Sequence, residues 1–176
     1  QASCCGALAH HINAEDAAHK QMEAVCSAWA NDIASGQLDA IIVNTSGCGT
    51  TLKDYVNLMS GNSRHSETAR KISDLTMDIS EYLNSQMALP TLAKQNMTIA
   101  YHAACSLQHG QKVLEAPRAL LAQAGFEVKT PAESHLCCGS AGVYNVLQPE
   151  LSQQLKERKI RNLNKVDADI ICAGNL

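Results

Sequence analysis

The triplet Cys-Cys-Gly occurs twice in this sequence, and similar segments follow each copy. Residues 4–6 precede a helical pattern and then the apolar run 38–44 (LDAIIVN). Residues 137–139 precede a second helical pattern and then the run 169–172 (DIIC). Because the copies lie about 130 residues apart in a chain of 176 residues, the sequence predicts one structural unit that is used twice.

Short apolar runs alternate with segments of helical spacing along the chain. The runs predict buried strands at 38–44, 97–102, 126–129 and 169–172. The helical patterns cover 13–34, 50–59, 72–83, 117–124 and the segment that begins at Pro149. This alternation predicts an α/β fold of two pseudo-repeated, Rossmann-like halves, with parallel sheets covered by helices. We place the halves at 1–90 and 91–176, joined by the segment 84–96.

The composition excludes several classes of protein. Apolar residues make up 45% of the chain, which is enough for a core, and aromatic residues only 3%, so that core must be mainly aliphatic. The net charge is −3 and basic residues form no run, so we do not expect a nucleic-acid partner. No apolar stretch is long enough to span a membrane, and no signal peptide is visible, so we expect a cytoplasmic protein. Because the chain begins at Gln1, we interpret it as an internal piece of a longer protein.

Eight cysteines is a high number for this length, and either a disulfide framework or metal binding could explain it. Four of them form two adjacent pairs, 4–5 and 137–138. Neighbouring Cα atoms lie about 3.8 Å apart across a trans peptide, whereas a disulfide usually needs about 4.4 Å or more. Adjacent cysteines are therefore poorly placed to bond each other, but both thiolates can face one metal site.

The cysteines also follow predicted strands. Cys48 lies in a predicted glycine-rich turn at 45–49 after one strand, Cys105 follows a second, and the pair 137–138 follows a third. The carboxyl ends of parallel strands share one edge of a sheet, so these thiolates can meet there. Iron–sulfur clusters are held by several Cys thiolates, and nearby glycines let the backbone bend and offer N–H groups to cluster sulfurs. The pattern favours iron–sulfur binding.

Four segments resemble the C-terminal CCG domain of the glycolate oxidase (glycolate dehydrogenase) iron–sulfur subunit. The same domain occurs in the heterodisulfide reductase B subunit and in lactate-utilisation proteins. The matching segments are SCCGALAHHINAE, NTSGCGTTLKDY, YHAACSLQHGQK and SHLCCGSAGVYNVLQPEL. The family pattern is a Cys, then a Cys pair, then a further Cys or a CxxC, used twice.

This resemblance implies two sets of cluster ligands, which also serve as the predicted metal-binding residues. The first set is Cys4, Cys5 and Cys48, and the second is Cys105, Cys137 and Cys138. It also implies a further first-site Cys upstream of Gln1. Aligning the two halves on their final strands places Thr45 on Asn175 and predicts a Gly-Cys directly after Leu176, so we expect both halves to be truncated. The family's N-terminal ferredoxin-like domain would belong to the parent chain.

The resemblance further implies an electron-transfer subunit of an oxidoreductase that acts on the CH–OH group of glycolate or a related 2-hydroxy acid. A separate flavin-containing glycolate oxidase subunit would take the hydride. Electrons would pass through clusters of the 4Fe-4S type to a quinone-type acceptor, with the complex peripheral on the inner face of the cell membrane. Thr45 stands where the heterodisulfide reductase branch has Cys, which argues against heterodisulfide chemistry. No residue of this chain is assigned to substrate catalysis.

Two alternatives stay open at this point, and a third is excluded. The chain could be a lactate-utilisation-type iron–sulfur protein, or a structural zinc domain, although zinc fingers normally separate their cysteines by two to four residues. A thiol–disulfide enzyme would need a C-x-x-C motif, which the chain lacks.

Other notable residues have simpler interpretations. Cys26 and Cys172 lie in apolar patterns, and we interpret both as core residues. The charged segment 156–161 is interpreted as a solvated helix face. Five histidines near the cysteine motifs could ligate metal, but we interpret them as loop residues bonded to backbone: His10, His11, His102, His109 and His135.

Overall fold

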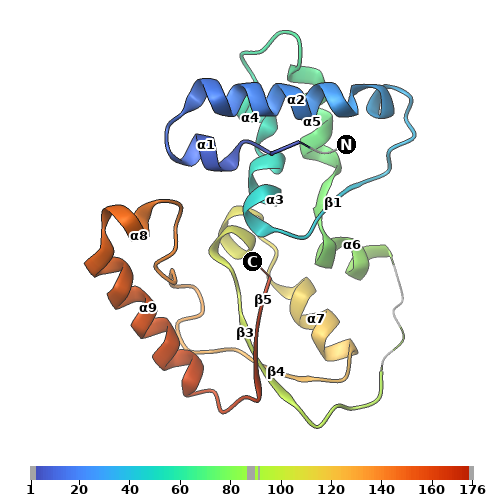
Figure 1. Ribbon diagram of the computed structural model, residues 1–176. Helices are drawn as coiled ribbons and strands as arrows, with labels where there is room; N and C mark the ends of the chain where they lie inside the picture. Colours follow the sequence, from blue (N-terminus) through green and yellow to red (C-terminus); the bar gives the residue numbers. More distant parts are fainter. Residues whose placement is uncertain (1–2, 87–89, 91, 175–176) are drawn as a thin grey trace. The chain divides into compact units, whose positions relative to one another are not determined.

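Parallel strands packed with helices make up both parts of the chain, which confirms the predicted α/β class. The computed structural model describes residues 3–86, 90 and 92–174. It forms two compact units, Gln1–Asp78 and Ile79–Leu176 (Figure 1). The predicted division of the sequence repeat at residue 90 stays a prediction. Among the described residues, no helix has both the length and the apolar character needed to cross a bilayer.

The first unit contains a two-stranded parallel sheet. Its elements are α1 (Ala7–His11), α2 (Glu15–Ala34), β1 (Ile41–Val43), α3 (Ser46–Lys53), α4 (Tyr55–Leu58), α5 (Ser66–Leu75) and β2 (Thr76–Asp78). Strand β1 pairs with β2, with Ile41 opposite Thr76.

Helix α2 supplies much of the core of this unit. Its buried side chains recur at one helical face: Ala18, Met22, Val25 and Cys26. Cys26 is completely buried within the hydrophobic cluster, so its prediction as a core residue is confirmed. Burying an aliphatic side chain such as Val25 or Met22 contributes about 1.5–3 kcal/mol. These buried side chains therefore hold α2 against the rest of the first unit.

Two local predictions in the first unit are wrong. The pattern 72–83 was expected to be one helix, but β2 interrupts it at Thr76–Asp78. The apolar spacing continues through that strand, and pairing with the distant β1 overrides it. The segment 45–49 was expected to be a turn, but α3 already begins at Ser46, after an extended Thr45 whose carbonyl accepts from the Gly49 N–H at 3.0 Å.

The second unit contains a three-stranded parallel sheet in the order β4-β3-β5. Its elements are α6 (Ile79–Gln86), β3 (Thr98–His102), the π-helix η1 (Ser106–Gly110), α7 (Glu115–Gln123), β4 (Glu127–Lys129), α8 (Tyr144–Leu147), α9 (Pro149–Asn164) and β5 (Ile170–Ala173). Central strand β3 is the buried one, with Ile99, Ala100 and Tyr101 all at most 4% exposed.

Strand β5 departs from its predicted burial because it lies at the edge of the sheet. Ile170 and Ile171 are 41% and 56% exposed. Cys172 is only partly buried, so its prediction as a core residue is wrong. The expected alignment of Thr45 with Asn175 and the connection at 87–89 and 91 lie outside the described residues.

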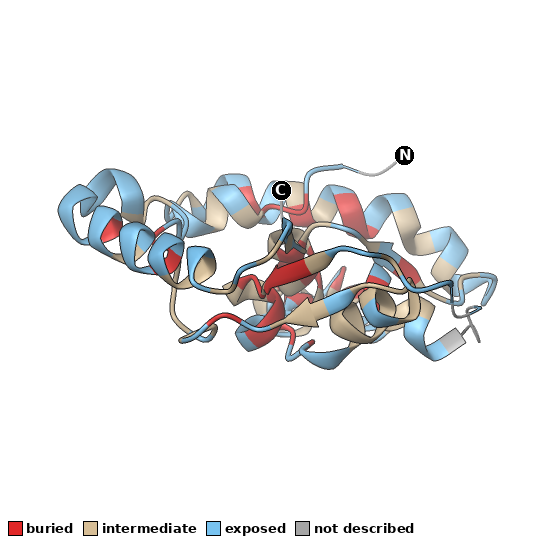
Figure 2. Ribbon diagram, turned by 90° about the horizontal axis from the view of Figure 1, so that it is seen from below, coloured by how far each residue is buried: buried red, intermediate tan, exposed pale blue. Residues whose placement is uncertain are grey.

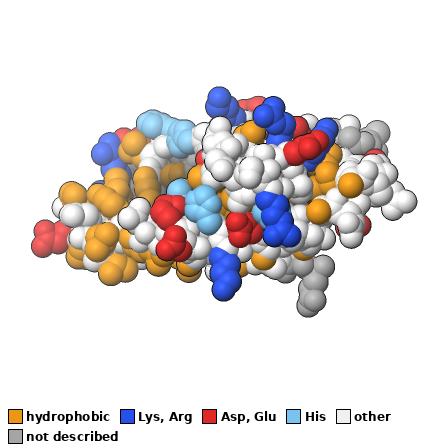
Figure 3. Space-filling view, turned by 90° about the horizontal axis from the view of Figure 1, so that it is seen from above, with side chains coloured by type: hydrophobic (Ala, Val, Ile, Leu, Met, Phe, Trp, Pro, Cys, Tyr) orange, Lys and Arg blue, Asp and Glu red, His pale blue; other side chains and the backbone are white. Residues whose placement is uncertain are grey.

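The exposed side chains are mixed in character. Figure 2 shows that α9 is largely exposed, and its two buried residues are Ser152 and Lys159. Figure 3 shows acidic and basic side chains interspersed on one face of the chain. The buried Lys159 contradicts the interpretation of 156–161 as a wholly solvated face.

Candidate metal centres

The first cysteine group lies in the first unit. Cys5 precedes α1 and is buried, and its thiol lies beside the thiol of Cys48, which is in the first turn of α3. Burial raises the pKa of Cys5 to about 12, and the neighbouring thiols of Cys48 and Cys4 add to this rise. Cys4 itself is exposed. A metal would therefore have to displace the Cys5 proton on binding.

The backbone around this pair is anchored on two sides. The Tyr55 hydroxyl, fully buried on α4, donates to the Cys5 carbonyl at 2.8 Å. Burial, followed by the charge of Cys5, raises the pKa of Tyr55, so the hydroxyl keeps its proton as a donor. Gly6 has φ +82°, and a Cβ at this position would lie 3.0 Å from the Ala18 carbonyl oxygen of α2. The Cys-Cys-Gly turn is therefore seated directly on α2.

The second cysteine group has the same components in the second unit. Cys105 lies between β3 and η1, and its thiol lies beside that of Cys137. Burial, followed by the charge of Cys137, raises the pKa of Cys105, whereas the backbone of Cys138 opposes that rise with a hydrogen bond. The Gly139 N–H donates to the Cys137 sulfur at 3.3 Å. This is the amide-to-sulfur contact expected around a cluster ligand.

The second Cys-Cys-Gly turn is also seated on the helix that follows it. Gly139 has φ +90°, and a Cβ there would lie only 2.4 Å from the Ser152 carbonyl oxygen of α9. The Ser152 hydroxyl donates to the Gly139 carbonyl at 2.8 Å. Gly6 contacts the residue twelve positions ahead and Gly139 the one thirteen positions ahead. The two turns thus share one local design, which supports an internal repeat.

The histidines near these groups are placed differently from one another. The His109 Nε2 lies 3.0 Å from the carbonyl oxygen of His135, which fits a loop histidine bonded to backbone. His10 instead pairs with the Glu15 carboxylate at 3.2 Å. His102 ends β3, and burial followed by the charge of Lys159 lowers its pKa. His11 and His135 are exposed.

The cysteine thiols are the side chains of this chain that would hold a metal cofactor. All eight cysteines are free thiols, so no disulfide framework is present. Within the described residues, 3–86, 90 and 92–174, no group of three or more His, Cys, Asp or Glu side chains is arranged to hold a metal ion. The structure brings together two thiol pairs, Cys5 with Cys48 and Cys105 with Cys137. Soft, partly buried thiols suit zinc or iron–sulfur binding, and the Gly139 N–H already donates to one of them. The ligand roles of the six cysteines stay a prediction.

Several residues that shape these groups carried no sequence signal. Tyr55 acts across fifty positions of chain, and Lys159 and Ser152 act from a helix that looks amphipathic and solvated. Of these contacts, only that of Gly139 with Ser152 could have been predicted, because Gly139 matches Gly6 in the internal repeat.

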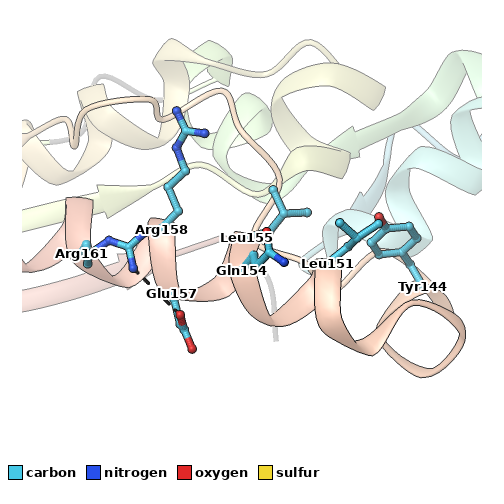
Figure 4. A pocket seen from close by; sticks show the side chains of 7 residues that line it. All are labelled: Tyr144, Leu151, Gln154, Leu155, Glu157, Arg158 and Arg161. Carbon is cyan, nitrogen blue, oxygen red and sulfur yellow. Dashed lines mark ion pairs between the residues drawn. The ribbon is translucent and has the colours of Figure 1, made fainter.

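One hollow of the second unit has no cysteine in its lining. It has a volume of about 450 Å³ and is open to solvent between α8 and α9 (Figure 4). Its lining residues are Tyr144, Leu151, Gln154, Leu155, Glu157, Arg158 and Arg161. None of them is a thiol, so this hollow does not belong to either cysteine group.

Comparison with known proteins gives consistent matches. The family described as "Cysteine-rich domain" (CCG) matches residues 1–53 and 99–175. The "Glycolate oxidase iron-sulfur subunit" of Escherichia coli K12 is 32% identical over 100% of this chain and 43% of its own length. The "Probable glycolate oxidase iron-sulfur subunit" of Bacillus subtilis 168 is 30% identical over 98% of this chain and 39% of its own length.

A second group of relatives has another name. "Lactate utilization protein A" of Anoxybacillus flavithermus is 23% identical over 98% of this chain and 71% of its own length. The chain spans only about two fifths of the first two relatives, 43% and 39%.

Proposed function

The chain belongs to the CCG cysteine-rich domain family, and on that premise we propose that it carries electrons in a complex that oxidises a 2-hydroxy acid. One observation carries the proposal. In each unit, a buried or half-buried pair of thiols from distant segments meets beside a Cys-Cys-Gly turn that is seated on the next helix. Two relatives with "glycolate oxidase iron-sulfur subunit" in their names support iron–sulfur chemistry for such a pair.

In this proposal the first cluster would be held by Cys4, Cys5 and Cys48, and the second by Cys105, Cys137 and Cys138. A bound cluster, of the 4Fe-4S type, supplies reversible one-electron transfer. The protein's part is to hold the thiolates, exclude water from Cys5 and direct the Gly139 amide at the Cys137 sulfur. A hydrogen bond to a ligand sulfur favours the reduced, more negative state of a cluster.

The thiol pKa values determine how such a site is loaded. Burial raises the pKa of both Cys5 and Cys105, so these two thiols are protonated at neutral pH when no metal is bound. Each ligand must lose its proton when metal binds, so loading releases protons and is favoured by higher pH.

The remaining chemistry belongs to partners in this proposal. A flavin-containing subunit takes the hydride from glycolate or a similar 2-hydroxy acid at its CH–OH group, and the electrons leave towards a quinone-type acceptor. The complex works in the cytoplasm or at the inner face of the cell membrane. The names of the relatives, which cover both glycolate and lactate, support this class of substrate.

The test is metal analysis and EPR spectroscopy of the anaerobically purified parent protein. We expect iron and acid-labile sulfide together with a cluster signal on reduction. Stoichiometric zinc without iron or sulfide would contradict the proposal and favour the structural zinc domain.

A further inference from the structure

Lysine 159 is buried beside the loop that leads into the second cysteine pair. Its side chain lies on α9 and is only 5% exposed. Its ammonium donates to two successive backbone carbonyls, of Glu133 at 3.2 Å and of Ser134 at 3.1 Å. Since Glu133 has φ +54°, a backbone conformation that non-glycine residues rarely adopt, these bonds fix an unusual bend just before Cys137.

The same loop is tied to the segment that carries Cys105. The Gln108 amide donates to the Ser134 carbonyl at 3.2 Å, and the His109 ring lies 3.0 Å from the His135 carbonyl. Both side chains come from η1, directly after Cys105. Three successive carbonyls are therefore held from α9 and η1, and this arrangement fixes the approach of the Cys137 loop to Cys105.

In the part of the chain that the structure describes, the buried Lys159 ammonium contacts two neutral carbonyls and no carboxylate. The Glu133 carboxylate, which would be the obvious counter-ion, is taken by the Arg158 guanidinium and by the Asn162 amide at 2.7 Å. A buried charge without an opposite charge is unfavourable, so its position calls for negative charge nearby.

Cys137 and Lys159 line one narrow hollow under the loop, together with the Glu133–Arg158 ion pair and with Asn162, Leu136 and Leu155. The charge also reaches the carboxyl end of β3, since it contributes to the lowered pKa of His102, after burial. Thiolates that bind metal at the second group would provide the missing negative charge.

The first unit has no such charge at the matching place. The glycine contacts align Ala18 of α2 with Ser152 of α9. Counting seven residues on from each gives Val25 and Lys159, both of which are buried. The two units therefore share their architecture and differ in charge at this position.

We propose that Lys159 is a positioning residue of the second cysteine group, which holds the Cys137 loop and supplies the buried positive charge that stabilises a bound cluster. This inference rests on the proposed iron–sulfur function. A fixed ammonium favours the reduced, more negative state of a cluster at the second group.

The experiment compares three variants with wild type in the parent protein. Lys159→Met removes charge and hydrogen bonds, Lys159→Gln keeps a donor without charge, and Lys159→Arg keeps both. Lys156→Met, on an exposed position of the same helix, is the matched control. The cluster signal that disappears in Cys138→Ser identifies the second group, and its midpoint potential is measured by redox titration with EPR.

We expect the second-group potential to shift negatively in the Met and Gln variants and to stay near wild type in the Arg and Lys156 variants. An unchanged potential in Lys159→Gln would overturn the electrostatic role, even if Lys159→Met fails to fold. Hydrogen exchange of residues 133–137 in the metal-free protein should be faster in Lys159→Met than in Lys156→Met. Equal exchange would overturn the positioning role, and this readout holds even if the protein contains no cluster at all.

Discussion

Replacing Gly139 by Ala tests how firmly the second Cys-Cys-Gly turn depends on α9. The residue has φ +90°, which costs an L side chain about 1–2 kcal/mol. The new Cβ would lie 2.4 Å from the Ser152 carbonyl oxygen and 3.1 Å from its carbon, so backbone must move. Such overpacking typically costs about 1–3 kcal/mol, and loss of the Ser152 hydrogen bond about 0.5–1.5 kcal/mol more. We expect a total cost of about 2.5–6.5 kcal/mol.

The assay is urea unfolding of the metal-free chain, followed by circular dichroism, with two matched glycine controls. Gly36 has φ +66° but no atom within 4 Å of an added Cβ, so Gly36→Ala measures the conformational cost alone, about 1–2 kcal/mol. Gly47 lies in α3 with open space and no positive φ, so Gly47→Ala should be neutral or stabilise by up to about 1 kcal/mol. If Gly139→Ala costs no more than Gly36→Ala, the proposed close contact with α9 is refuted.

Three further predictions concern the first cysteine group. Gly6→Ala should cost about 2–3 kcal/mol in urea unfolding, which is more than Gly36→Ala and less than Gly139→Ala. The reason is that its added Cβ would lie 3.0 Å from the Ala18 carbonyl oxygen, whereas that of Gly139 would lie 2.4 Å from the Ser152 carbonyl oxygen. A cost above that of Gly139→Ala would contradict this order. Tyr55→Phe leaves the Cys5 carbonyl without its donor and should cost about 1–3 kcal/mol in the same assay, whereas a neutral change would speak against the hydrogen bond. The pKa of Cys5 rises from 9.0 to about 12, so its contribution to stability is complete below pH 9 and lost between pH 9 and 12; thiolate absorbance of the folded, metal-free Cys5 at pH 9 would disprove this shift.

Segments with a strong local pattern could be predicted from the sequence. Helix α2 repeats buried residues at one face, and β3 is a continuous apolar run, so both lie where they were expected. The grouping of Cys5 with Cys48 could also be anticipated, because the family resemblance places both cysteines in one ligand set.

Features that depend on distant partners could not be predicted. The residues of β2 continue a helical spacing, and only pairing with β1 makes them a strand. Strand β5 reads as buried, but its exposure depends on its place at the edge of the sheet. Lys159 reads as a surface residue, and its burial depends on carbonyls about twenty-five positions earlier.

The central claim is that the paired cysteines bind iron, and the most direct measurement compares two cysteine variants of the parent protein. Cys138→Ser changes a proposed ligand, whereas Cys26→Ala trims a completely buried core thiol and should cost only modest stability. Iron and acid-labile sulfide per chain, measured after anaerobic purification, should fall in Cys138→Ser and stay at the wild-type value in Cys26→Ala. Equal iron content in the two variants would contradict the account.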